Sequence, residues 1–240
     1  MYRPVAAAVA VVIASMMLLC TGGAAPARAQ DVAAFLAGRS KDCPGCDLSG
    51  AKLKRRDLSG ANLAGADLTG ANLNKTSLLQ ANLSHAKMKG AMLFEAEAGR
   101  ADFSGADLTE ALMGGIHLLG GKLDGANLTE ADLEAAQLDD ASFAGARLDG
   151  ANLHQGRMLR ANLRGAVADS TDFTGANMRE VNLHGAALRQ SIFFLADLGV
   201  ADLSSADLSY AVLRSANLTG ANQTGAILTG AMMPDNSIHP

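Results

Sequence analysis

Two cysteines separated by a proline and a glycine carry the clearest chemical potential in this 240-residue sequence, in the segment Cys43-Pro44-Gly45-Cys46. Such a pair can form a structural disulfide, remain as two buried thiols, or act in redox or metal chemistry. A redox pair needs a helix N-terminus that stabilises its thiolate, and the leucine-rich stretch that follows offers none. A zinc site would need two further ligands, and no second C-x-x-C motif is present. We therefore expect a buried disulfide between Cys43 and Cys46, with free thiols or a reactive pair as the alternatives.

No other residues form a recognisable catalytic or metal-binding pattern. The sequence lacks a G-x-S-x-G nucleophile motif, an H-E-x-x-H zinc motif and a phosphate-binding glycine loop. Its five histidines are too dispersed to make a ligand set: His85, His117, His154, His184 and His239. We therefore expect no enzyme activity, no cofactor and no bound metal.

Most of the chain repeats a five-residue unit, seen in the run Ala61-Asn62-Leu63-Ala64-Gly65. The unit consists of Ala, then Asp or Asn, then Leu, and then two small or polar residues. Its central apolar position recurs from Leu48 to Met233 without an insertion, which makes about 38 units. Five is neither the period of an α-helix nor that of a continuous strand, and Gly, Asn and Asp are turn residues. A short extended piece followed by a turn fits this unit.

The unit resembles the repeat of the pentapeptide-repeat family, and the resemblance covers nearly everything after Cys46. It implies an all-β fold, a right-handed quadrilateral β-helix with four repeats, and hence twenty residues, in each coil. The central side chains would stack inside on the residues twenty positions away, and the Ala position would fill the corners. About nine coils at ~4.8 Å spacing would then make a rod about 45 Å long.

The first 29 residues have the pattern of a secretory signal peptide. Arg3 is followed by an apolar run over 5–19, and Ala27-Arg28-Ala29 has the small residues of a cleavage site. An uncleaved anchor helix is the alternative, although the run is shorter than the ~20 residues that span a bilayer. After cleavage the chain would begin near Gln30, would be periplasmic or secreted, and would have no membrane contact. An oxidising compartment of this kind permits a disulfide.

A short helix is expected at the start of the mature chain, over residues 31–37, with Asp31 as its N-cap. An open solenoid end exposes apolar core and unpaired backbone groups, so it needs a cover. Val32, Phe35 and Leu36 fall on one helical face and are the expected cover. A disordered leader is the alternative interpretation.

The mature chain therefore divides into three parts, which are a cap over 30–46, a repeat region over 47–233 and a tail over 234–240. At the far end, Pro234 stops further backbone pairing. No long helix follows it to cover the last coil. Either Ile238 folds back over this end, or the open end pairs with a second molecule to form a homodimer.

Departures from the repeat test this interpretation. Ala168 replaces Leu at a central position, and the next centre is Phe173, so a large side chain compensates for a small one. Phe193 lies twenty residues after Phe173, so the two rings should stack. Arg56 occupies a small inward position, where an uncompensated charge is costly. We expect a local distortion that lets its guanidinium reach solvent.

The outward Asp/Asn position can be sorted by face with the twenty-residue interval. One face carries an acidic ladder, which Lys87 and Arg147 interrupt. On the adjacent face several outward positions are apolar, and clustered apolar side chains suggest a partner surface. The candidate protein-binding residues are Met92, Phe94, Leu112, Ile192, Phe194, Leu195 and Val212. An irregular turn that buries some of them, or isolated surface residues without a role, are the alternatives.

The sequence thus predicts a non-enzymatic, exported solenoid that serves as a scaffold or binds a protein partner through this face. A formal net charge of −4 gives no basic surface for nucleic acid, and we expect none to bind. The alternative is a DNA-mimicking inhibitor of a topoisomerase, because the resemblance extends to cytoplasmic proteins that act in this way. The two basic interruptions and the signal peptide argue against that alternative.

Overall fold

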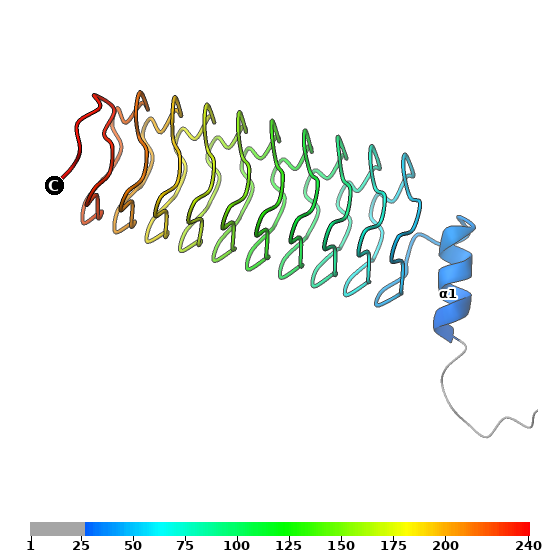
Figure 1. Ribbon diagram of the computed structural model, residues 1–240. Helices are drawn as coiled ribbons and strands as arrows, with labels where there is room; N and C mark the ends of the chain where they lie inside the picture. Colours follow the sequence, from blue (N-terminus) through cyan, green and yellow to red (C-terminus); the bar gives the residue numbers. More distant parts are fainter. Residues whose placement is uncertain (1–26) are drawn as a thin grey trace, which may run out of the picture.

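The computed structural model describes residues 27–240, which form one α-helix followed by a long rod of stacked coils (Figure 1). The helix, α1 (Ala27–Leu36), lies at one end of the rod, and the C-terminus lies at the other. Most of the expected signal peptide, with Cys20, falls outside the described residues. In the part of the chain that is described, no helix has the length and apolarity needed to cross a membrane.

Successive coils are joined by parallel β-bridges between residues twenty positions apart, such as Asn62 and Asn82. Two backbone hydrogen bonds accompany this bridge. The Leu63 N–H donates to the Asn82 carbonyl at 2.7 Å, and the Asn82 N–H donates to the Ala61 carbonyl at 2.9 Å. Each repeat contributes one bridged residue, so residues 27–240 contain isolated bridges and no longer strand. The β-helix is therefore built from very short extended pieces, because a turn follows every centre.

The corners of the coil depend on the fifth residue of the unit, which has a left-handed backbone. Gly65, with φ of +65°, adopts this conformation without steric cost. Val200 adopts it with φ of +60°, which is strained for a β-branched residue. The residue before the centre fixes the turn, since Asp67 Oδ1 accepts a hydrogen bond from the Thr69 N–H at 3.0 Å.

The core consists of the central side chains, stacked at twenty-residue intervals along the axis. These columns begin at Leu48, Leu53, Leu58 and Leu63, and we call the outer surfaces over them faces 1 to 4. The Leu centres of the middle coils are fully buried, as are most of the inward Ala residues. The predicted ring stack is confirmed, since the Phe173 and Phe193 centroids lie 5.0 Å apart with planes 8° from parallel.

The helix α1 differs from the predicted one in its start and in one covering residue. It begins at Ala27, so Asp31 lies inside the helix and is not the N-cap that we expected. Ala and Arg have high helix propensity, which lets the helix extend upstream of the carboxylate. Phe35 is fully buried and Val32 is half-buried against the core, whereas Leu36 is 50% exposed. Leu36 therefore does not cover the coil, because it lies on the outer side of the last helical turn.

The disulfide between Cys43 and Cys46 is present, and both residues are buried beside the first coil. The Cys46 N–H donates to the Cys43 carbonyl at 3.3 Å, which closes the turn through Pro44 and Gly45. The disulfide thus closes a short loop immediately before the repeat region.

The local distortion that we expected at Arg56 is absent, and Arg56 is half-buried. Its guanidinium donates a hydrogen bond to the Phe35 carbonyl at 2.7 Å and lies 4.9 Å from the centre of the Phe35 ring. A positive charge at a helix C-terminus is favourable, and a cation over an aromatic face adds to it. The repeat continues without interruption at Arg56, because α1 supplies the polar partner that an inward charge needs.

The C-terminal end is covered on one side only. The tail turns back, so that Ile238 forms an antiparallel bridge with Met232 and the His239 N–H donates to the Ala231 carbonyl at 2.9 Å. The Ile238 side chain is 59% exposed and does not cover the core. Along the rest of the last coil, the backbone N–H groups at centre and corner positions find no hydrogen-bond acceptor within the described chain, those of Leu218, Gly220, Gln223, Gly225 and Leu228.

Candidate protein-binding face

The candidate protein-binding residues lie on face 2, but in two clusters. The N-terminal cluster is Met92, Phe94 and Leu112, and the C-terminal cluster is Ile192, Phe194, Leu195 and Val212. Within each cluster a bridge joins neighbouring coils, Met92 with Leu112 and Ile192 with Val212. Four coil spacings, or ~19 Å, separate the clusters, and the bridged residues between them are Asp132, Asn152 and Asp172.

The N-terminal cluster is shaped by a glycine. Phe94 is 48% exposed and Leu112 is 49% exposed, whereas Met92 is half-buried. A Cβ added at Gly114 would lie 3.4 Å from the Phe94 ring, so the ring lies over the space that a side chain would occupy. A hollow of about 410 Å³ opens beside the ring, with Glu134 among its lining residues. The cluster thus offers an apolar ring at the edge of a shallow, partly acidic depression.

The C-terminal cluster combines apolar exposure with a strained corner. Ile192 is 37% exposed and Leu195 is 57% exposed, and Leu195 has the left-handed φ of +60°. Phe194 and Val212 are half-buried. The Arg214 guanidinium lies 5.1 Å from the centre of the Phe194 ring and shields part of it. The alternative that an irregular turn buries this cluster is wrong for Ile192 and Leu195, because the turns keep their regular geometry here.

Apolar exposure is not confined to face 2, and the sequence interpretation missed the rest. Leu79 and Leu119 are exposed on face 3, and Val200 continues the C-terminal cluster around the corner onto that face. Tyr210 and Ile227 line a second hollow of about 470 Å³ on face 1. The twenty-residue sorting would have found Leu79, Leu119, Val200 and Tyr210 if it had been applied to the two turn positions of every face. It would have found Ile227 if the outward position of face 1 had been followed into the last coil.

The acidic ladder of face 1 is engaged in its own turns and ion pairs. The Thr69 hydroxyl and N–H hold the pKa of Asp67 below its ordinary value. Burial opposes ionisation of Asp207, yet hydrogen bonds from Ser209 and Arg189 hold its pKa below the ordinary value. Arg189 Nε lies 2.6 Å from Asp207 Oδ2. These carboxylates therefore have local structural partners and do not form a free row of negative charge.

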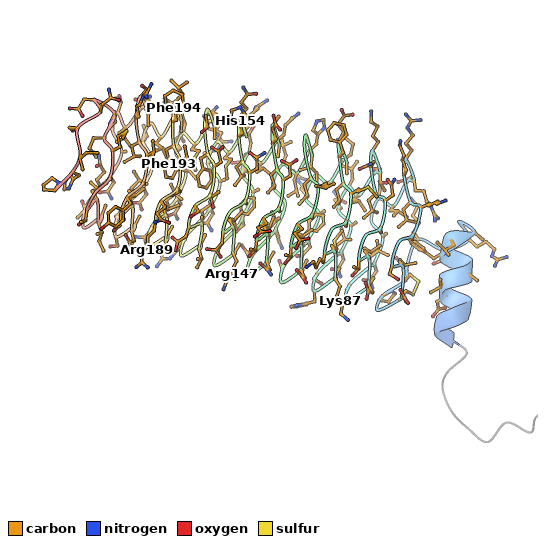
Figure 2. All side chains as sticks on the ribbon, in the orientation of Figure 1. Lys87, Arg147, His154, Arg189, Phe193 and Phe194 are labelled. Atoms are coloured by element: carbon orange, nitrogen blue, oxygen red, sulfur yellow. A yellow bond between two sulfur atoms is a disulfide. The ribbon has the colours of Figure 1, made fainter. Side chains whose placement is uncertain are left out.

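In Figure 2 the basic side chains of face 1 and the candidate protein-binding face lie on opposite edges of the rod. Lys87, Arg147 and Arg189 lie along one edge of the rod, while Phe194 lies along the opposite edge. Among the described residues, no three His, Cys, Asp or Glu side chains gather closely enough to hold a metal ion.

Comparisons with known proteins agree with the repeat architecture. A family model described as pentapeptide repeats matches in eight copies, over residues 46–84, 61–96, 77–109, 122–155, 157–193 and 196–233. The chain is 31% identical to HetL, a pentapeptide repeat protein involved in heterocyst differentiation regulation in the cyanobacterium Nostoc sp. strain PCC 7120. That match covers 87% of this chain and 98% of HetL, with a TM-score of 0.48.

Two further solved structures are similar over smaller or more divergent regions. QnrB1, a plasmid-mediated fluoroquinolone resistance protein, is 19% identical over 78% of this chain and 89% of its own, with a TM-score of 0.34. A pentapeptide repeat protein from the thylakoid lumen of Arabidopsis thaliana is 29% identical over 53% of this chain and 72% of its own, with a TM-score of 0.23. The sequence matches none of the curated proteins. The family model and the match to HetL establish that this chain belongs to the pentapeptide-repeat family.

Proposed function

We propose that the protein is a non-enzymatic, exported scaffold that binds a protein partner through face 2. The observation that carries this proposal is the exposure of Phe94, Leu112 and Leu195 at outward positions that are polar in most other repeats. Exposed apolar side chains that cluster on one surface of a soluble protein are typical of interaction sites. A rigid rod holds the two clusters at a fixed separation of ~19 Å, which suits a partner that contacts both.

The same proposal includes the finer description of the fold. The twenty-residue interval of the bridges supports four repeats per coil. The buried Phe35 ring and the Arg56 hydrogen bond to its carbonyl support α1 as the N-terminal cap. The right-handed, four-sided coil itself is inferred from family resemblance.

Export rests on the signal-peptide pattern of residues 1–29. Sequencing the N-terminus of the protein recovered from cells tests it, and we expect a start near Gln30 in the periplasmic or secreted fraction. A protein that begins at Met1 and is found in the cytoplasmic fraction would refute the proposed export. That result would revive the topoisomerase alternative, against which the paired carboxylates of face 1 also count.

Self-association through the C-terminal end is the second part of the partner proposal. The unpaired N–H groups of the last coil form a strand edge, and such edges pair readily with another chain. Tyr210, Ile227 and Ile238 add exposed apolar area near this end. We expect a dimer in light-scattering measurements, and a monomer when Ile227→Glu and Ile238→Lys are combined. A wild-type protein that stays monomeric at ~100 μM, above the Kd of most specific complexes, would remove this part.

Photo-crosslinking tests face 2 directly, because the repeat provides matched control positions. A benzoylphenylalanine placed at Phe94 or Phe194 should crosslink to a distinct partner in cells. The same residue at Ser84 or His184 occupies the equivalent position on face 4 and should not. Equal crosslinking from both faces would show that the reagent reports general proximity, and the proposal would fail.

A double substitution complements the crosslinks. Ile192→Lys with Phe194→Glu should abolish the adduct formed from position 94 or weaken it several-fold, while the circular dichroism spectrum stays unchanged. Asn182→Lys with His184→Glu is the matched control on face 4 and should leave the adduct intact. An adduct that survives the face 2 substitutions at wild-type strength would restrict the site to the N-terminal cluster.

A further inference from the structure

The charges of this protein are segregated along the rod. Residues 39–56 contain six basic residues and two acidic ones, a formal charge of +4. Residues 57–240 contain twelve basic and twenty-one acidic residues, a formal charge of −9. The positive segment forms the junction with α1 and the first two repeats of the first coil, so the rod has one basic end and an acidic body.

Four of the six basic side chains at this end are available to a ligand. Lys52, Lys54 and Arg55 are exposed on one repeat of face 2, and Arg39 is exposed just after α1. Within residues 27–240, none of these four side chains forms an ion pair. The other two are engaged, Lys41 with Asp57 at 2.6 Å and Arg56 with the carbonyl of Phe35.

Three of the four side chains belong to one surface, because Lys52, Lys54 and Arg55 are exposed on the same repeat of face 2. Arg39 lies in the segment between α1 and the first coil. Farther along the rod the charge declines. Lys75 lies in the coil after Arg55 and is paired with Glu95 at 2.8 Å.

The basic end is also where the N-terminal segment of the chain joins the rod (Figure 1). The apolar run over 5–19 precedes α1 in the sequence, so any membrane association of that run would bring this end to the bilayer surface. After cleavage near Gln30 the four unpaired cations would remain. Anionic lipid headgroups are complementary in charge to these cations, and this complementarity names the occupant.

We propose that the basic end docks on an anionic lipid bilayer and that the rod stands away from the membrane. A bilayer with anionic headgroups favours each nearby Lys or Arg by about fivefold in partitioning. The field decays within a Debye length of ~8 Å at physiological salt, so it acts on the first coils and not on the body. The acidic body is repelled, so contact with the bilayer is confined to the first coil. The two apolar clusters of face 2 lie farther along the rod and stay accessible. This proposal replaces our expectation that the mature chain has no membrane contact.

Vesicle co-sedimentation of the protein purified from its native fraction tests the proposal. We expect binding to phosphatidylcholine vesicles with 30% phosphatidylglycerol, release at 300 mM NaCl, and no binding to pure phosphatidylcholine. Lys52→Glu, Lys54→Glu and Arg55→Glu together should weaken binding by at least ~100-fold, which is the product of three fivefold effects. Lys87→Glu, Lys122→Glu and Arg164→Glu together make the same change in net charge on the body and should weaken it much less.

Three results would overturn the proposal. The first is a wild-type protein that does not bind the phosphatidylglycerol vesicles at 50 mM NaCl. The second is an equal loss in both triple variants, which would mean that net charge and not the basic end controls binding. The third is binding to soluble poly-glutamate without binding to vesicles, which would assign the basic end to an acidic protein. Circular dichroism of each variant verifies that the coils remain folded.

Discussion

The two ends of the rod solve the same physical problem in opposite ways. At the N-terminal end, the Phe35 ring is fully buried, Arg56 binds the last turn of α1, and a disulfide joins Cys43 to Cys46. At the C-terminal end, the tail pairs along one side through Ile238, and the remaining edge of the last coil keeps unpaired N–H groups. One end is closed to further pairing and the other is open to it.

The comparison teaches that the repeat determines its own interior but not its boundaries. Every middle coil receives its hydrogen bonds from two identical neighbours, whereas an end coil must obtain them from residues outside the repeat. Burial reflects this, since Leu203 is 1% exposed while the centres Leu218 and Leu228 in the last coil are only partly buried. Stability should therefore be lost unequally when the two ends are altered.

The largest effect is expected from the ring that closes the N-terminal end. Phe35→Ala removes a fully buried aromatic side chain and should lower the free energy of unfolding by about 3 kcal/mol. Urea denaturation followed by circular dichroism measures it. Leu36→Ala, at the exposed neighbour, is the control and should change it by less than ~0.5 kcal/mol. Equal effects at the two positions would mean that α1 is not a cap.

The disulfide should contribute the next largest share. Cys43→Ala combined with Cys46→Ala should cost about 1–2 kcal/mol, because a bridge that closes so short a loop constrains the unfolded chain only modestly. The same loss should follow when the wild-type protein is reduced under partly denaturing conditions. A loss above ~4 kcal/mol would instead indicate that the first coil cannot form without the bridge, since that exceeds the loop-entropy estimate.

For Arg56→Ala, the test is whether the free energy of unfolding rises or falls. Ala is the common residue at this inward position, so the substitution would stabilise a protein in which Arg56 had no role. We expect a destabilisation of about 1 kcal/mol, because the helix loses a charged hydrogen-bond donor at its C-terminus. Hydrogen exchange of the α1 amides should become faster, while exchange in the coil around Phe193 should not change.

Removal of the tail should have a smaller effect on stability than any change at the capped end. Ending the chain at Pro234 deletes an exposed pairing and should cost less than ~1 kcal/mol. The Gly230 amide should exchange faster, because it donates to the His239 carbonyl at 2.9 Å in the intact chain. The Leu218 and Leu228 amides should exchange rapidly with or without the tail. Protection of those two amides in the isolated protein would point to a partner already bound at this end.

The smallest expected effect is the loss of stability at acid pH, and it should also differ between the two ends of the rod. A hydrogen bond from Lys41, with help from Ser59, holds the pKa of Asp57 well below its ordinary value of 3.8. At the tail, hydrogen bonds from Ser237 and from the backbone of Asp235 itself lower the pKa of Asp235 without any lysine or arginine. Both folded pKa values lie below the unfolded value, so this stabilisation is present above about pH 4 and is lost as pH falls through the folded pKa. Titration of the carboxyl carbons by NMR should find both pKa values below 3.8. Lys41→Met should raise the pKa of Asp57 and leave that of Asp235 unchanged.

The periodic part of the fold could be predicted from the sequence, and the non-periodic part could not. The five-residue interval, together with the four repeats per coil that the family resemblance implies, was enough to place the centres inside and to predict the stack of Phe173 on Phe193. The start of α1 was predicted wrongly, and the distortion predicted at Arg56 is absent. Both depend on how a non-repeating segment packs against the first coil. A fixed period contains no information about that contact.

The candidate face was predicted in outline. The seven residues do lie over one column, but the sequence could not show that ~19 Å separates them into two clusters of different character. Two contacts depend on side-chain conformations that the sequence does not specify. The Arg214 guanidinium lies over the Phe194 ring, and the Phe94 ring lies over Gly114 in the next coil. The exposed Leu119 and Val200 could have been predicted, since they follow from the same register on face 3.

The twenty-residue interval of the bridges has a consequence for how the chain acquires its shape. Each layer needs only the layer made immediately before it, however long the finished rod becomes. A polypeptide that emerges with its amino end first could therefore add layers in sequence on the seed that α1 and the first coil provide, without waiting for distant segments. Growth of this kind has a direction, and it ends at the edge that is still able to accept another layer.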